Sequence, residues 1–149
     1  VPEFGGDTLW SNQYLAYEEL SLGLRETLDG LFAVHQGVDA DDDDSPFPAA
    51  STSVHPVVVT HDRTGRRALY VDPHDTRRLD GWTEEESRAL LAHLFRVSVR
   101  VELTCRHRWT VGDVVIWDNR ATQHCSLDDA PPDEPRVLHR VAIAGDFPH

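Results

Sequence analysis

The sequence contains few cysteines and no long apolar run. No stretch approaches the roughly 20 apolar residues that cross a bilayer, and the N-terminus lacks the basic and apolar segments of a signal peptide. We therefore predict a cytoplasmic protein. The two cysteines, Cys105 and Cys125, are too few for a disulfide scaffold and are not spaced as CxxC. We predict free thiols, and a single bridge is the alternative.

Basic residues are also scarce. Lys and Arg together number 14 against 26 Asp and Glu, which gives a formal net charge of −12. Nucleic-acid grooves and proteins that bind anionic membranes need clustered basic side chains, so the composition argues against both kinds of partner. An arginine that matters for function is expected to be a local recognition device.

The length of 149 residues suffices for one domain with a hydrophobic core and is too short for two comfortable ones. We expect a single domain over 1–149 with one interruption. An acidic interval rich in Pro, Ser and Ala at about 39–53 has no apolar periodicity and cannot bury a face. It is predicted to be a flexible loop.

Short β-rich segments and two helices make up the remaining pattern. Apolar side chains within 14–31 recur at spacings of three and four, which predicts an amphipathic helix capped by Ser11 or Asn12. Thr83 precedes three glutamates and predicts a second helix that ends near Arg96. A β-hairpin is predicted over 55–61 and 67–72, and further strands over 99–109, 113–117, 122–126 and 137–144. Without βαβ alternation, these elements favour a jelly-roll or barrel-like sheet over a Rossmann sheet.

The most informative stretch runs from Gly112 to Asp146. Its first part reads GD-x-x-x-WDNR-x-x-x-H and ends at His124, and its second reads R-x-x-x-R-x-x-x-x-GD and begins at Arg136. Residues an even number apart share one face of a regular strand, so Arg136 and Arg140 are predicted to point the same way. Two inward guanidiniums would form an anion pocket in an otherwise acidic protein. A histidine near them suggests a metal beside carboxylate ligands.

These motifs resemble the C-terminal signature of the taurine and chlorophenoxyacetate dioxygenase family. The opening GGDTLW at 5–10, HPVV at 55–58 and Arg78 are also similar to that family, and the likeness follows the chain in order. The resemblance implies a fold that is mainly β with flanking helices, the double-stranded β-helix or cupin-like jelly roll. It also implies Fe(II) as cofactor, with 2-oxoglutarate and O₂ as co-substrates.

The resemblance assigns roles to four residues. The histidine of the WDNR-x-x-x-H motif is an iron ligand in the family, which places iron on His124. The first arginine of the pair and the threonine of GGDT bind 2-oxoglutarate there, matching Arg136 and Thr8. The second arginine faces the acidic group of the substrate, matching Arg140. The implied reaction hydroxylates a small sulfonate, sulfate or carboxylate and releases succinate and CO₂.

One part of the family pattern is missing from this sequence. The family holds iron with two histidines and one carboxylate, and places a His-x-Asp or His-x-Glu pair upstream of GGDT. None of the nine histidines is followed two positions later by Asp or Glu. We therefore expect an incomplete, C-terminal portion of the domain. A stable piece of a longer protein and a protein that has lost catalysis are the alternatives.

A different class of function fits the same residues. A catalytically silent jelly-roll module would use Arg136 and Arg140 to bind a small dicarboxylate or sulfonate. Outside the motif, His124 would be a hydrogen-bonded structural residue, and the arginines would be surface partners of Asp and Glu. Trp109 and Trp117 are most simply core aromatics. A homo-oligomer is left open.

Overall fold

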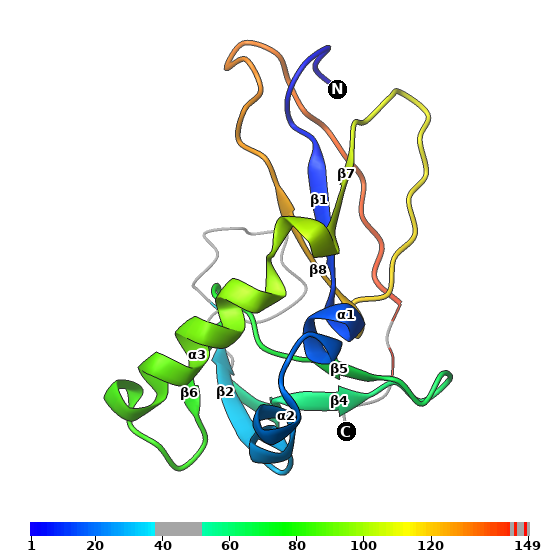
Figure 1. The fold of residues 1–149 in the computed structure, drawn as a ribbon. Helices are drawn as coiled ribbons and strands as arrows, with labels where there is room; N and C mark the ends of the chain where they lie inside the picture. Colours follow the sequence, from blue (N-terminus) through cyan, green and yellow to red (C-terminus); the bar gives the residue numbers. More distant parts are fainter. Residues whose placement is uncertain (38–51, 144, 146–147, 149) are drawn as a thin grey trace.

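The computed structural model describes residues 1–37, 52–143, 145 and 148. It contains two three-stranded antiparallel sheets (Figure 1). The first sheet has the order β7 (Thr104–His107), β1 (Thr8–Asn12) and β8 (Thr122–Ser126). The second has the order β3 (Thr52–Pro56), β2 (Phe32–Gln36) and β6 (Thr76–Leu79). A separate hairpin pairs β4 (Val58–Thr60) with β5 (Arg67–Leu69). The predicted arrangement of short strands with flanking helices is confirmed.

The first sheet fixes the relative positions of the predicted site residues. In the pairing of β1 with β8, Thr8 lies opposite Ser126 and Trp10 lies opposite His124. Alternate residues of a strand face the same side of the sheet. Thr8, Trp10 and His124 are therefore presented on one face.

The same sheet separates the two cysteines. Cys105 of β7 lies opposite Trp10, and Cys125 of β8 lies opposite Leu9. Trp10 and Leu9 are adjacent in β1 and face opposite sides, so the two thiols do as well. Both cysteines are free and exposed, which confirms the prediction.

The helix predicted over 14–31 is two shorter helices. α1 (Gln13–Glu18) begins at the predicted cap Asn12, whose side chain accepts hydrogen bonds from two backbone N–H groups of the first turn. α2 (Leu22–Leu28) begins anew at Ser21, whose hydroxyl accepts a backbone N–H of its own first turn. Ser21 has extended backbone angles, so the helix breaks there although the apolar spacing continues.

The second predicted helix is α3 (Glu84–Ser98), and it begins at Thr83 as expected. Thr83 and Glu86 form a reciprocal capping box, in which each side chain accepts the backbone N–H of the other residue. The helix ends at Ser98, two residues beyond the predicted Arg96. A single 3₁₀ turn (Val101–Leu103) follows and leads into β7.

Three of the predicted strands are wrong in whole or in part. The segment 99–109 is a strand only within β7, and no strand is found at 113–117 or in the described part of 137–144. Their apolar side chains are exposed: Ile116 is 90% and Val141 is 91% exposed. A strand requires a neighbour for its backbone N–H and C=O groups. The described part of the chain provides these two segments with none.

The region predicted as a loop and a hairpin is arranged differently. Residues 39–51 of the predicted acidic loop lie outside the described residues, and 52–53 belong to β3 rather than to a loop. The hairpin predicted over 55–61 and 67–72 is confirmed at β4 and β5. Residues 55–56 instead belong to β3, which pairs with β2.

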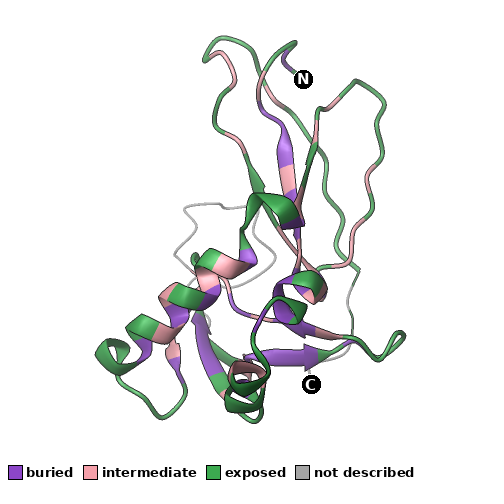
Figure 2. Ribbon diagram, viewed as in Figure 1, coloured by how far each residue is buried: buried purple, intermediate pink, exposed green. Residues whose placement is uncertain are grey.

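The hydrophobic core lies where α1 and α3 pack with β2, β4, β5 and β6, away from the free end of the first sheet (Figure 2). Its largest fully buried apolar side chains are Leu28, Leu69, Leu79 and Leu94. The first sheet extends from this core, and the segments beyond it are mostly exposed in Figure 2. None of the helices in the described residues is long and apolar enough to cross a membrane.

Candidate functional site

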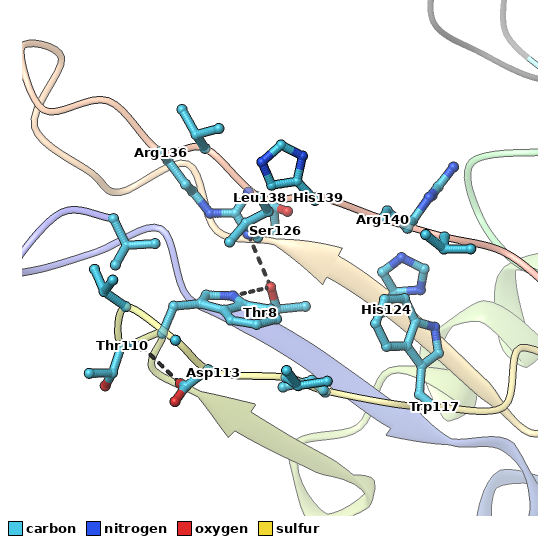
Figure 3. A pocket seen from close by; sticks show the side chains of 18 of the residues that line it. Thr8, Thr110, Asp113, Trp117, His124, Ser126, Arg136, Leu138, His139 and Arg140 are labelled. Atoms are coloured by element: carbon cyan, nitrogen blue, oxygen red, sulfur yellow. Dashed lines mark hydrogen bonds between the residues drawn. The ribbon is translucent and has the colours of Figure 1, made fainter.

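A cavity of about 730 Å³ lies against the first sheet (Figure 3). One side is formed by residues of β1 and β8, among them Thr8 and His124. The other sides are formed by 109–115 with Trp117, and by 136–141. Segments from both ends of the described chain therefore enclose one space.

Two segments that are 128 residues apart meet at Thr8 and Arg136. Arg136 donates from Nε to the Gly6 carbonyl at 2.6 Å and from Nη2 to the Thr8 hydroxyl at 3.2 Å. This approach requires glycine at position 6, which has a φ of +66° and where a Cβ would lie 2.8 Å from Arg136 Cδ. Gly5 also has a positive φ, and a Cβ there would collide with the backbone of Asp129. The GGDT motif thus holds Thr8 against the guanidinium.

An ion-pair network braces the GGDT segment from its other side. The buried carboxylate of Asp7 accepts from Arg106 Nε at 2.5 Å, and Arg106 also pairs with Asp129 at 3.3 Å. Asp129 accepts the Gly6 N–H at 2.8 Å. These contacts tie the segment before Thr8 to β7 and to the chain that leaves β8.

His124 lies between two tryptophans and an arginine. Its ring stacks on Trp10 with centroids 6.4 Å apart and an interplanar angle of 22°, and Trp117 lies 5.1 Å away. Figure 3 shows Arg140 on the remaining side. Partial desolvation within the cavity lowers the pKa of His124, and the positive charge of Arg140 lowers it further. Both effects favour the neutral imidazole, the form in which histidine binds a metal.

Two arginines, Arg136 and Arg140, line the cavity. Five arginines pair with Asp or Glu: Arg66, Arg67, Arg100, Arg106 and Arg120. Within the described residues, neither Arg136 nor Arg140 forms such a pair. The carboxylate of Asp113 also lines the cavity, but it accepts from His107 Nε2 and from the Thr110 N–H, both at 2.9 Å. The cavity thus holds two guanidinium groups that are available to anions, in a strongly acidic chain.

The turn that precedes β8 is held by a buried histidine. His61 Nδ1 accepts from the backbone N–H groups of Arg63 and Thr64, so its Nε2 carries the proton and donates to Asp118 at 2.9 Å. Arg120 donates to both oxygens of Asp118, at 3.1 and 2.9 Å. The hydrogen bonds from Arg120 hold the pKa of Asp118 well below its usual range, and the bond from His61 adds to this. His61 therefore has a structural role, in holding this turn.

We expect Asp118→Asn to lower the free energy of unfolding at neutral pH by roughly 1 kcal/mol, a value reduced for solvent screening. Asp118 is 39% exposed, so the ion pair is only partly protected from water. Because its folded pKa is depressed, the carboxylate stabilises the fold above its unfolded pKa of about 3.9, and this stabilisation is lost as pH falls further. The difference between wild type and variant in urea unfolding should therefore shrink below about pH 4.

The matched control is Asp80→Asn. Asp80 is exposed and makes no ion pair within the described residues. Its replacement should leave the acid dependence of unfolding unchanged. Equal acid dependence in wild type and Asp118→Asn would show that the depressed pKa contributes nothing to stability.

The structure brings all four residues with predicted roles to one cavity, but the predicted strand that was to carry the two arginines does not form. Arg136 and Arg140 were expected to share a face of a strand, yet their segment is not a strand. Both line the cavity nevertheless. Trp109 and Trp117 were predicted to be core aromatics, and both are half-buried cavity walls instead. The available signal was that Trp117 begins the WDNR motif and that Trp109 lies three residues before the GD motif.

The donor set for a metal is incomplete within the described residues. His124 is exposed to the cavity and offers one nitrogen ligand. No group of three or more His, Cys, Asp or Glu side chains suited to a metal ion occurs in the part of the chain that the structure describes. An iron site on His124 therefore needs protein ligands that these residues do not supply.

Comparison with known proteins identifies relatives along the whole chain. The model of the "Taurine catabolism dioxygenase TauD, TfdA family" matches residues 1–142. An alpha-ketoglutarate-dependent sulfate ester dioxygenase from Pseudomonas putida is 41% identical over 162 residues, covering 99% of this chain and 53% of that protein. An alkylsulfatase from Acinetobacter baylyi is 37% identical over 160 residues, covering 98% of this chain and 50% of that protein.

Solved structures of related proteins resemble this chain in fold. A taurine dioxygenase from Burkholderia xenovorans superposes with a TM-score of 0.77 at 42% identity, covering 87% of this chain and 43% of that one. The predicted jelly-roll class is confirmed by this likeness. The chain spans about half the length of the curated relatives that it matches.

Proposed function

The chain belongs to the TauD, TfdA family of taurine catabolism dioxygenases, and on this basis we propose that it forms the co-substrate-binding part of an Fe(II)- and 2-oxoglutarate-dependent dioxygenase. The proposed reaction takes up O₂, hydroxylates a C–H bond of a small acidic substrate and converts 2-oxoglutarate to succinate and CO₂. A sulfate ester, a sulfonate or a carboxylate fits the cationic cavity. The cytoplasmic location and the homo-oligomer stay predictions.

The observation that carries this proposal is that Arg136 and Arg140 line one cavity with His124, where neither arginine has an acidic partner among the described residues. Five arginines pair with Asp or Glu, but others outside the cavity also lack an acidic partner within the described residues, so the missing ion pairs are informative only together with the shared cavity. Arg136 and Arg140 both line the cavity and keep free N–H donors for ligands. Two separate cationic groups fit two separate anions, the co-substrate and the substrate.

Each residue has a distinct task in this proposal. Arg136 and Thr8, already hydrogen-bonded to each other, bind the distal carboxylate of 2-oxoglutarate. Arg140, next to His124, holds the acidic group of the substrate and so directs its C–H bond towards the metal. The indole rings of Trp109 and Trp117 exclude water from one wall, which strengthens the charged contacts in the cavity.

His124 is the proposed iron ligand of this chain. When bound, Fe(II) would supply the activation of O₂ that no amino-acid side chain performs. The protein contributes the imidazole, the orientation of both anions and a shielded cavity. The proposal requires two further protein ligands, and none of the described residues provides them.

The incomplete donor set favours a second candidate, a catalytically silent jelly-roll module that binds a small dicarboxylate or sulfonate. It shares Arg136, Arg140 and the fold with the enzyme, so these features do not separate the two. Binding of iron distinguishes the two candidates, since only the enzyme requires a metal at His124.

The test is an anaerobic titration with Fe(II) and 2-oxoglutarate, followed by visible absorption. A metal chelated by the 2-oxo acid gives a weak charge-transfer band, which we expect in the full-length product of the gene. The same titration of residues 1–149 tells whether the remaining ligands lie within this chain. Absence of the band from both proteins would contradict the dioxygenase and favour the silent module.

Arg140→Ala should weaken binding of the primary substrate more than that of 2-oxoglutarate. Loss of a charge-assisted hydrogen bond is expected to raise the KM for a short alkyl sulfate by roughly 10- to 100-fold. Steady-state kinetics of the full-length enzyme measure this change. Arg88→Ala is the control, because Arg88 is exposed on α3 and outside the cavity. An unchanged KM in Arg140→Ala would remove the assignment of an acidic substrate group to this residue.

A further inference from the structure

The hydroxyl group of Thr8 accepts two hydrogen bonds within the cavity. Trp109 Nε1 lies 2.9 Å and Arg136 Nη2 lies 3.2 Å from Thr8 Oγ1. An indole N–H and a guanidinium N–H are donors only, so the direction of both bonds is unambiguous. Figure 3 shows the two bonds converging on Thr8, which is only 3% exposed.

These two bonds leave the Thr8 hydroxyl group able to act only as a hydrogen-bond donor to a ligand. A hydroxyl oxygen has two lone pairs and one hydrogen. Trp109 and Arg136 occupy both lone pairs, and the hydrogen meets no acceptor in the described residues. Thr8 lines the cavity, so this hydrogen remains for a ligand.

We propose that Trp109 is a positioning residue that fixes Thr8 as a hydrogen-bond donor to the bound carboxylate. Without the indole N–H, the hydroxyl is free to rotate and to present a lone pair to the ligand. With it, the corner formed by Thr8 and Arg136 presents only donors. The inference rests on the proposed function, because it takes the ligand of this corner to be the distal carboxylate of 2-oxoglutarate.

A corner that presents only donors selects an ionised carboxylate over its amide. A carboxylate is an acceptor at both oxygens, whereas the amide NH₂ is a donor that needs an acceptor. The indole N–H of Trp109 therefore contributes to specificity as well as to affinity. A purely structural tryptophan, held by its ring contacts with Trp10 and His107, would not change this discrimination.

The test compares binding of 2-oxoglutarate and of its 5-amide to the full-length protein, by calorimetry in the presence of Mn(II) as a redox-inert metal. Trp109→Phe keeps an aromatic ring and removes the N–H. We expect it to raise the dissociation constant of 2-oxoglutarate about tenfold. The preference for 2-oxoglutarate over the amide should fall by a similar factor.

A double-mutant cycle separates the proposed link from independent contributions. Thr8→Val should weaken binding about as much as Trp109→Phe, and the double variant should be no weaker than Thr8→Val alone. Thr8→Ser, which restores the hydroxyl, should recover most of the affinity. The control for replacing tryptophan is Trp82→Phe, at an exposed position outside the cavity.

Two results would overturn the inference while leaving the proposed function intact. One is a wild-type protein that binds 2-oxoglutarate and a folded Trp109→Phe variant with unchanged affinity and amide discrimination. The other is full additivity of the two substitutions. If Trp109→Phe fails to fold, the amide discrimination of Thr8→Val decides the question, since it must also fall. Failure of the wild type to bind 2-oxoglutarate would overturn the proposed function and this inference with it.

Discussion

His124→Ala is expected to abolish iron-dependent turnover. His124 lines the cavity beside Arg140, and partial burial together with that positive charge lowers its pKa, which favours the metal-binding form of the imidazole. Changes in residues that merely orient a metal ligand reduce metal affinity or activity by about 10- to 100-fold. Removal of the ligand itself should cost at least about 100-fold in activity. The charge-transfer band and succinate formation in the full-length protein measure the loss.

The fold should tolerate this substitution. His124 is exposed to the cavity, and its ring packs against the surfaces of Trp10 and Trp117 rather than in the hydrophobic core. The unfolding temperature should therefore stay close to that of the wild type. His93→Ala provides the control, because His93 is exposed on α3. Retained activity in a folded His124→Ala variant would remove the central assignment of the site.

Arg136→Ala should chiefly weaken the binding of 2-oxoglutarate. Two of the five guanidinium N–H groups bind Gly6 and Thr8, and the other three remain for the carboxylate. Loss of charge-assisted bonds worth about 3 kcal/mol should raise the dissociation constant on the order of 100-fold. Calorimetry with Mn(II) measures this directly, and binding of the primary substrate should change less.

Arg136→Lys distinguishes charge from geometry at the same position. Lysine keeps the positive charge but lacks the planar fork that matches a carboxylate at two points. We therefore expect an affinity between those of the wild type and Arg136→Ala. Binding of 2-oxoglutarate at wild-type strength by the alanine variant would show that another cation holds the co-substrate.

Local signals in the sequence were interpreted correctly where the interaction itself is local. The capping box at Thr83 involves residues three apart, and Asn12 caps the helix that directly follows it. The break at Ser21 was missed because the spacing of apolar residues continues across it, while the cap depends on backbone angles that the spacing does not reveal.

Strand predictions failed where pairing is not local. The segments 113–117 and 137–144 have the composition of strands, and composition expresses preference for a half-buried pleated surface. Whether a strand forms depends on a neighbour that offers backbone donors and acceptors. In contrast, the segment 122–126 does form a strand with the predicted bounds, because β1 lies beside it and supplies the backbone partners.

The sequence by itself determined which chemical groups this protein has: an acidic chain, two arginines four positions apart, a histidine at the end of the WDNR motif and two unpaired thiols. The tertiary structure alone decided that Thr8, Trp109 and Arg136 meet at one hydroxyl. It also decided that Arg136 and Arg140 line the same cavity, where neither pairs with an acidic side chain of the described residues. Such contacts join segments about a hundred residues apart, and no local pattern records them, because they depend on how the sheets pair and on the glycines that let the backbone approach.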